Sequence, residues 1–192
     1  MFGFVNAKQM IRCELSADQM RSSIDAAMQI WEFRKRWAKS GTQGNWQQGQ
    51  FSKPWLSFAV GLRGEIAFWE IMRTWIQNLP RYDLSAKNKV AKSDFVFDSP
   101  FGKRHEIKTS VNRDLFSTNY VRTDHLERND VFWFACVRDL ESPNFVLRGW
   151  ATRDEITKRG VKKFNKKGGW ENFAIETDML NPISKFLIKG DG

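Results

Sequence analysis

Two short segments, KSDFVF at residues 92–97 and RHEIKT at residues 104–109, decide the fold that this sequence predicts. We expect two strands joined by a tight turn, with Asp94 on the first strand. Because side chains alternate between the two faces of a strand, Glu106 and Lys108 on the second strand point the same way. Two carboxylates and an ammonium group gathered beside a sheet cost free energy unless a metal or a substrate uses them. The pair of strands is therefore the first candidate for a functional site.

The same alternation places the neighbours of Glu106 on the opposite face of the second strand. Ile107 is expected to be buried there, and His105 is expected to be a structural residue on that side. His125 lies in a polar segment further along the chain, and nothing in its spacing assigns it a role.

The composition suits one domain over residues 1–192, and the net charge of +9 with a pI of about 9.7 favours a polyanionic partner. Nucleic acid is the first choice, an anionic membrane surface the second, and a merely basic protein the alternative. No apolar run reaches the ~20 residues of a membrane span. The N-terminal residues lack the pattern of a signal peptide, and two distant cysteines suit neither a disulfide framework nor a zinc site, so we expect a cytoplasmic protein.

Two helices are expected before the strands. Ser16, with Gln19 three residues on, predicts a capping box at the start of a helix over about residues 16–38, within an N-terminal helical segment at about 16–53. This helix carries an apolar stripe at helical spacing, and a second helix covers about 55–78. Glu65 lies on or beside the apolar stripe of this second helix, where an acid is out of place if the face only packs. The alternative for Glu65 is an ion pair with Arg63 or Arg73.

After the second helix, the chain predicts a central sheet. Residues 131–137 are continuously apolar, which is typical of a strand covered on both faces, and residues 144–151 form another strand. The basic stretch at residues 158–169 is expected to be a loop. The order of these elements predicts a mixed α/β (α+β) fold with a central mixed β-sheet flanked by helices.

An acid on a helix, an acid on a strand, and an E-x-K pair on the next strand resemble the catalytic core of the PD-(D/E)XK nuclease superfamily. The resemblance covers about residues 55–150 and implies a restriction-endonuclease-like sheet. One departure is that the first strand reads Ser93-Asp94, without the proline of the family motif. The residues that carry the resemblance are Glu65, Asp94, Glu106 and Lys108.

The resemblance implies a metal-dependent deoxyribonuclease that hydrolyses phosphodiester bonds in DNA endonucleolytically, with RNA still open as a substrate. It implies Mg²⁺, with Mn²⁺ able to substitute, held by Asp94, Glu106, the backbone carbonyl of Ile107 and Glu65. Lys108 would orient or deprotonate the attacking water, or stabilise the developing charge. A homodimer is expected, since cutting two antiparallel strands needs two sites.

Other residues are candidates for contacting the nucleic acid because they are basic or aromatic in polar surroundings. These residues are Trp46, Arg113, Arg122, Lys162, Lys163, Lys166 and Lys167. Two alternatives stay open: a non-catalytic nucleic-acid-binding module with a degenerate nuclease-like core, and a structural protein whose acids form ordinary salt bridges.

Overall fold

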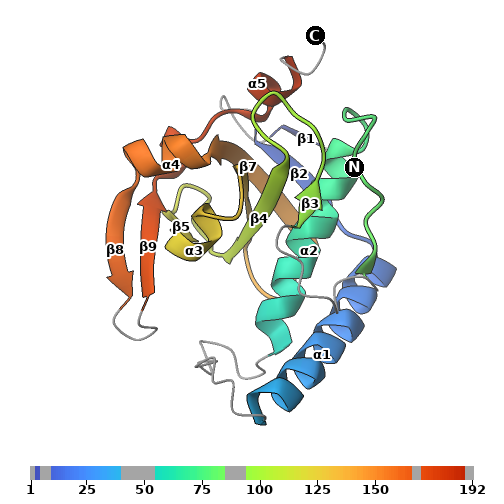
Figure 1. Ribbon diagram of the computed structural model, residues 1–192. Helices are drawn as coiled ribbons and strands as arrows, with labels where there is room; N and C mark the ends of the chain where they lie inside the picture. The colour runs from blue at the N-terminus through green and yellow to red at the C-terminus, as the bar shows by residue number, and fades with distance from the viewer. Residues whose placement is uncertain (1–2, 5–9, 40–54, 85–93, 166–169, 189–192) are drawn as a thin grey trace.

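The computed structural model describes residues 3–4, 10–39, 55–84, 94–165 and 170–188 (Figure 1). Strands and helices alternate along much of the chain. The elements are β1 (Gly3–Phe4), β2 (Ile11–Glu14), α1 (Ala17–Lys39), α2 (Trp55–Met72), β3 (Phe95–Val96), β4 (Arg104–Val111), β5 (Asn119–Arg122), α3 (Thr123–Leu126), β6 (Val131–Val137), β7 (Asn144–Thr152), α4 (Arg153–Arg159), β8 (Val161–Asn165), β9 (Trp170–Ile175), a 3-10 turn (Thr177–Met179) and α5 (Ile183–Ile188).

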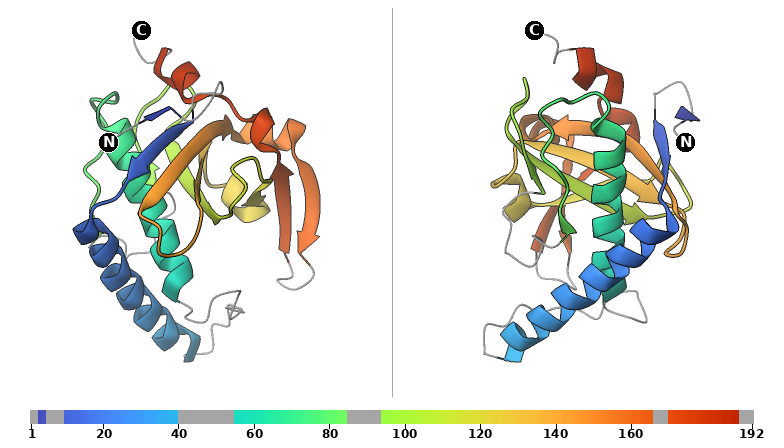
Figure 2. Two further views of the ribbon diagram at one scale, coloured as in Figure 1. Left: turned by 180° about the vertical axis from the view of Figure 1, so that it is seen from behind. Right: turned by 90° about the vertical axis from the view of Figure 1, so that its right-hand side faces the viewer.

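A mixed sheet in the order β1-β2-β7-β6-β4-β3 forms the centre of the molecule. Strands β4 and β6 run parallel, and the other neighbours are antiparallel. Every residue of β6 is buried, which confirms the expectation of a central strand covered on both faces. Helix α2 lies against one face of the sheet, and α1 packs on α2 from outside (Figure 2). The predicted mixed α/β class is confirmed.

A second, antiparallel sheet has the order β5-β9-β8. Here the expectation of a loop is wrong over residues 161–165, which form β8 and pair with β9. Residues 166–169 of that stretch lie outside the described residues. Exposed lysines are compatible with an edge strand, since they face water and discourage pairing with another chain. The sheet packs on the face of the central sheet opposite α2, through a core that includes Phe132 and Phe173.

The start of the first predicted helix is confirmed, whereas the second helix ends earlier than predicted. Helix α1 begins with the expected capping box, in which the amides of Ser16 and Gln19 each donate to the other residue's side chain. Residues 40–53 of the predicted helical segment lie outside the described residues.

Helix α2 ends at Met72 and not near residue 78. The Thr74 hydroxyl donates to a carbonyl of the last turn, and the chain then tightens into i→i+3 turns.

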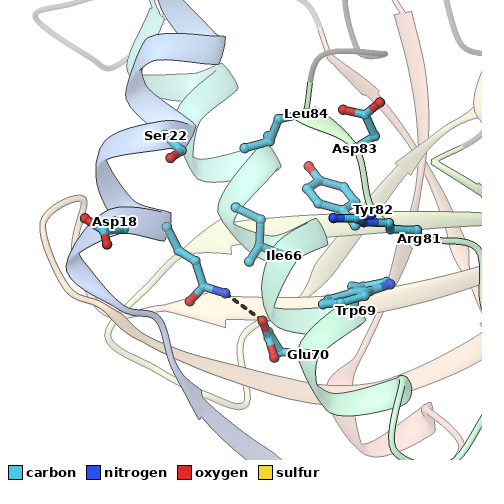
Figure 3. A pocket seen from close by; sticks show the side chains of 10 residues that line it. Asp18, Ser22, Ile66, Trp69, Glu70, Arg81, Tyr82, Asp83 and Leu84 are labelled. Carbon is cyan, nitrogen blue, oxygen red and sulfur yellow. Dashed lines mark hydrogen bonds between the residues drawn. The ribbon is translucent and has the colours of Figure 1, made fainter.

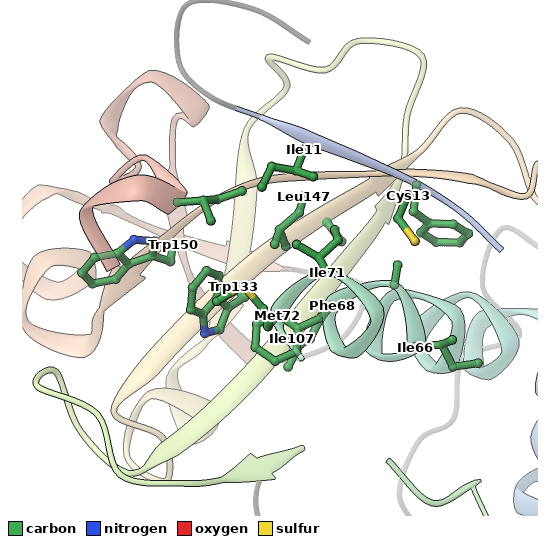
Figure 4. Close-up of a cluster of buried hydrophobic side chains, with 14 of the residues drawn as sticks. Ile11, Cys13, Ile66, Phe68, Ile71, Met72, Ile107, Trp133, Leu147 and Trp150 are labelled. Carbon is green, nitrogen blue, oxygen red and sulfur yellow. The ribbon is translucent and has the colours of Figure 1, made fainter. Parts of the chain in front are cut away.

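Helix α2 is buried nearly all round because it lies between α1 and the sheet. Its side chains interlock with the strands in the main core, where Phe68 contacts Trp133 at 5.0 Å between ring centroids (Figure 4). At Gly64 the helix meets β4 so closely that an added Cβ would overlap the Thr109 side chain. This contact fixes where the next helical residue, Glu65, stands relative to β4.

Among the described residues, no helix combines the length and the apolar character that crossing a bilayer requires.

Candidate active site

Strand β4 separates an apolar side from a polar one. On the side of α2, the His105 ring is fully buried and stacks on Phe97 with ring centroids 3.9 Å apart. The Trp133 indole N–H donates to His105 Nδ1 at 3.3 Å, and burial lowers the pKa of His105 to about 4. The prediction that His105 faces away from Glu106 is confirmed, and at neutral pH it is an uncharged packing residue.

On the opposite side of β4, Glu106 and Lys108 point the same way, as predicted. Lys108 Nζ lies 2.6 Å from Glu106 Oε1. His125 from α3 brings its Nδ1 to 2.8 Å from the same oxygen and to 2.9 Å from Lys108 Nζ. Asn129 donates to the other carboxylate oxygen at 3.1 Å. The sequence analysis assigned no role to His125 or Asn129, since their distance along the chain from Glu106 follows no regular spacing.

The three close atoms of Glu106, Lys108 and His125 can share protons in two ways. A single ring nitrogen either donates to the carboxylate or accepts from the ammonium group, because one nitrogen cannot do both. Lys108 donates to both neighbours when Nδ1 is unprotonated, and only to Glu106 when Nδ1 carries the proton. The cluster therefore holds an amine, an imidazole and a carboxylate in a geometry that allows proton transfer among them.

Glu106 stays ionised despite its surroundings. Burial raises its pKa, but the hydrogen bonds and positive charges of His125 and Lys108 outweigh this, so the pKa falls from 4.5 to about 2. The side chain is only 11% exposed, so solvent screens these interactions weakly. The cluster therefore favours a carboxylate at all but very acidic pH.

Acid is expected to destabilise the protein through Glu106. A carboxyl group whose pKa is depressed by folding contributes stability above its unfolded pKa, and this contribution is lost as pH falls from 4.5 towards 2. Up to about 3 kcal/mol of unfolding free energy is at stake. Urea unfolding of wild type and Glu106→Gln across this window measures it, with exposed Glu127→Gln as the matched control. Parallel pH profiles for wild type and Glu106→Gln would contradict the assignment.

Asp94 lies beside β4, just before β3, and continues the hydrogen bonding between these two strands. Strand β3 begins only at Phe95, which pairs with His105, and the backbone N–H of Asp94 still donates to the His105 carbonyl at 3.1 Å. One step further along this register, Asp94 stands opposite Glu106. Its Oδ2 accepts the backbone N–H of Ile107 at 2.8 Å. Because the N–H and C=O of a strand residue point to the same edge, the carbonyl of Ile107 faces the Asp94 side as well.

Glu65 reaches this region from α2, on the other face of the sheet. It is 8% exposed and accepts a hydrogen bond from the Tyr82 hydroxyl at 3.2 Å. Burial, the charge and hydrogen bond of Glu65, and the charge of Asp94 all raise the pKa of Tyr82. Tyr82 thus bonds Glu65 directly and feels the negative charge of Asp94. The alternative ion pairs are not found, because Arg63 bonds Ser23 and the Leu140 carbonyl, while Arg73 pairs with Glu70.

Three of the four predicted catalytic residues meet at one stretch of β4: Glu106 and Lys108 contact each other directly, and Asp94 bonds the Ile107 amide at the strand edge. Glu65 lies on α2, which packs on the other face of the sheet, and accepts a hydrogen bond from Tyr82 there. Tyr82 was not among the predicted site residues. It precedes a segment that the sequence gives only as a polar connection, so no pattern pointed to it.

The donor chemistry of this region suits a hard divalent cation. Within the described part of the chain, no group of three or more His, Cys, Asp or Glu side chains is arranged to hold a metal ion. Mg²⁺ does not need such a cage, because it commonly keeps several waters and takes one or two carboxylates from the protein. The oxygens of Asp94, Glu106 and the Ile107 carbonyl are of that kind.

The predicted nucleic-acid contacts have different surroundings. Arg122 pairs with Asp124 and lies over the Trp170 ring, Lys162 is 3.8 Å from Glu171, and Lys163 lies 5.9 Å from the centroid of Tyr120. Arg113 is exposed just beyond the end of β4. Trp46, Lys166 and Lys167 lie outside the described residues.

A pocket of about 700 Å³ opens between α1, α2 and residues 81–84 (Figure 3). Gln19 donates to Glu70 across its floor, and Tyr82 lines its wall. The pocket adjoins Glu65 through Tyr82, but Glu106 and Lys108 do not line it. Its lining contains three acids, two aromatic rings and the single arginine Arg81, so negative charge predominates there.

A scan against protein-family models and searches of curated proteins and of solved structures found no match for this chain.

Proposed function

We propose that this protein is a Mg²⁺-dependent nuclease of the PD-(D/E)XK type, with a restriction-endonuclease-like core, that hydrolyses phosphodiester bonds in DNA. The observation that carries the proposal is the arrangement at β4. Asp94 caps the Ile107 amide at the strand edge, and Glu106 and Lys108 project together from the adjoining face. An acid-bearing strand that leads into an E-x-K strand, with an acidic helix behind, is the order that the resemblance requires.

The roles follow from the chemistry of each group. A bound Mg²⁺ would supply charge neutralisation at the phosphoryl oxygens. Asp94, Glu106 and the Ile107 carbonyl would hold it, and Glu65 would support the site from behind through Tyr82. Lys108, anchored at 2.6 Å by Glu106, presents an ammonium group that orients the attacking water and stabilises negative charge on the phosphate.

His125 extends this set as a proton-exchanging neighbour of Lys108. Its Nδ1 lies 2.9 Å from Lys108 Nζ, so the ammonium group can pass a proton to an unprotonated ring and become a neutral amine, which can then accept a proton from the attacking water. In this proposal, Lys108 touches the reacting water, while His125 acts through Lys108 as a positioning residue.

A non-catalytic nucleic-acid-binding module is the second candidate function. One observation favours it. Both oxygens of the Glu106 carboxylate already have hydrogen-bonding partners, from Lys108, His125 and Asn129, so the carboxylate does not need a metal ion to balance it. On this alternative the cluster only stabilises the fold, and the positive charge of the chain serves binding alone.

Calorimetric titration with Mn²⁺, combined with cleavage assays in Mg²⁺, tests the proposal. We expect wild type to bind the metal and to cut at least one of supercoiled plasmid, linear duplex and single-stranded DNA. Asp94→Asn and Glu106→Gln are expected to lose both properties, because each removes a charged oxygen ligand. The control is Asp98→Asn, which neutralises an exposed acid on the same hairpin.

The outcomes separate the two candidate functions. DNA binding without a metal site that depends on Asp94 and Glu106 would support the binding module. Metal binding and cleavage that survive both substitutions would refute the assignment of these residues. Light scattering during the same experiments measures whether the active species is the proposed homodimer.

A further inference from the structure

A pocket of about 510 Å³ lies at one end of the central sheet, outside the cluster of Glu106, Lys108 and His125. Three arginines from separate parts of the chain line it: Arg12 from β2, Arg113 just after β4, and Arg138 just after β6. The side chains of Asn112, Ser142 and Asn144 add polar groups to the wall. We call this the arginine pocket.

The arginine pocket lies on the same face of the sheet as Lys108. Along the strand pairing, Ser110 stands beside Cys136, Cys136 beside Val146, and Val146 beside Arg12. Ser110 is two residues after Lys108 on β4, so both point the same way. Cys136, which lines the pocket, therefore lies one step of about 7 Å beyond the level of Lys108 and one strand, about 5 Å, to the side. From there the pocket extends across the neighbouring strands.

The position is one where sheets commonly bind ligands. Strands β4 and β6 are parallel, and Arg113 and Arg138 follow their carboxyl ends. Open sheets with parallel strands hold ligands in the crevice outside those ends. The arginine pocket thus lies beyond the carboxyl end of β4, the strand that carries Glu106 and Lys108.

The positive charges of the arginine pocket outnumber the negative charges of its described lining. Among the described residues, none of the ion pairs involves Arg12, Arg113 or Arg138, and all three side chains are exposed. The one acid in the lining, Asp139, is used locally, since its Oδ1 accepts the amides of Glu141 and Ser142 in the β6–β7 turn. The pocket has more positive than negative charge and suits an anion.

The loop that presents Arg113 is held in place from inside. The buried Arg148 guanidinium donates to the Ser117 carbonyl at 3.2 Å and to the Ser110 hydroxyl at 3.1 Å. The Asn112 amide donates to the Val137 carbonyl at 2.9 Å. The backbone on both sides of Arg113 is anchored to the sheet. Binding of an anion therefore costs less conformational entropy than it would in a loop without these anchors.

We propose that Arg12, Arg113 and Arg138 bind backbone phosphates of the nucleic-acid strand that passes Lys108. The identity of that strand rests on the proposed function. Guanidinium groups match phosphate oxygens with paired hydrogen bonds, and phosphate contacts set the position of a strand without reading its sequence. The arginine pocket is therefore a phosphate-binding site that positions the scissile bond at Lys108 independently of the base sequence.

Binding of a fluorescent DNA oligonucleotide in EDTA, measured by anisotropy over a range of salt concentrations, tests the proposal without cleavage. The Arg113→Ala/Arg138→Ala variant is expected to bind roughly tenfold more weakly per arginine at 0.1 M salt. Its slope of log affinity against log salt is expected to fall by about 2. The matched control is Arg21→Ala, an exposed arginine on α1, which packs on α2 at the opposite face of the sheet.

Further arms separate charge from folding and nucleic acid from free anion. Arg113→Lys/Arg138→Lys keeps the charges and is expected to keep most of the salt slope. Inorganic phosphate and pyrophosphate are titrated by calorimetry into wild type. A free anion that binds at the pocket while the oligonucleotide does not would overturn the nucleic-acid assignment.

The experiment also distinguishes this inference from the proposed function. An unchanged affinity and slope in the alanine double variant would overturn the arginine pocket, even if wild type cuts DNA in Mg²⁺. A reduced slope in the double variant supports the pocket, even if wild type cuts no DNA and the nuclease proposal fails. Failure of wild type to bind any oligonucleotide would overturn the inference outright.

Discussion

Replacing Lys108 with alanine is expected to abolish DNA cleavage while leaving divalent-metal binding in place. Asp94 and Glu106 keep their oxygens in this variant, but the ammonium group that is proposed to face the reacting water is gone. A positioned acid–base or charge-stabilising group contributes about 10²- to 10⁴-fold to the rate, which corresponds to about 3–5 kcal/mol of activation free energy. Single-turnover cleavage and Mn²⁺ calorimetry on the same preparation measure the two effects separately.

Lys103 provides the matched control for Lys108. It lies in the same hairpin, is exposed, and pairs with the exposed Asp98 at 2.9 Å. Lys103→Ala removes the same charge close by and is expected to leave the single-turnover rate unchanged. If Lys108→Ala cuts DNA at the wild-type rate, or if both variants lose activity equally, Lys108 does not have the proposed role.

Substituting two glycines of α2 with alanine is expected to change stability in opposite directions. At Gly64 a Cβ would overlap the Thr109 hydroxyl group, so the helix or the strand must shift. Overpacking of this kind costs about 1–3 kcal/mol. At Gly61 no atom lies within 4 Å of the added Cβ, and alanine in a helix gains about 0.5–1 kcal/mol over glycine. Urea or thermal unfolding of both variants measures the difference.

The Gly64 effect has an internal check. In Gly64→Ala/Thr109→Ala, the overlapping Oγ1 and the nearby Cγ2 are both absent, while Thr109 Cβ, only 2.9 Å from the added carbon, is retained. We expect the second substitution to restore part of the lost stability. If Gly61→Ala and Gly64→Ala stabilise the protein equally, α2 and β4 do not approach as closely as described.

The sequence predicted most of the framework of the site because its signals are local. Alternation alone placed Glu106 with Lys108 and His105 on the other side, and the apolar run of residues 131–137 identified the central strand. A capping box marked the start of α1. Each of these signals involves residues a few positions apart, so no knowledge of the tertiary fold was needed.

The parts that could not be predicted depend on long-range contacts. His125 reaches Glu106 only because β5 and α3 fold back over the open face of β4. Tyr82 reaches Glu65 from a connection with no periodic pattern. Strand β8 has a loop-like composition and becomes a strand because β9 offers a partner. The early end of α2 follows from a threonine hydroxyl that no hydrophobic count includes.

The pairing of β2 with β7 has a consequence for the order in which the protein folds during synthesis. Ile11 lies beside Leu147, so the ribosome must release most of the chain before β2 can pair with β7. Strand β4 likewise waits for β6, its parallel partner. Such distant pairings are slow to close. Asp94, Glu106 and Lys108 are therefore translated before the strand that completes the pairing of β4 has emerged.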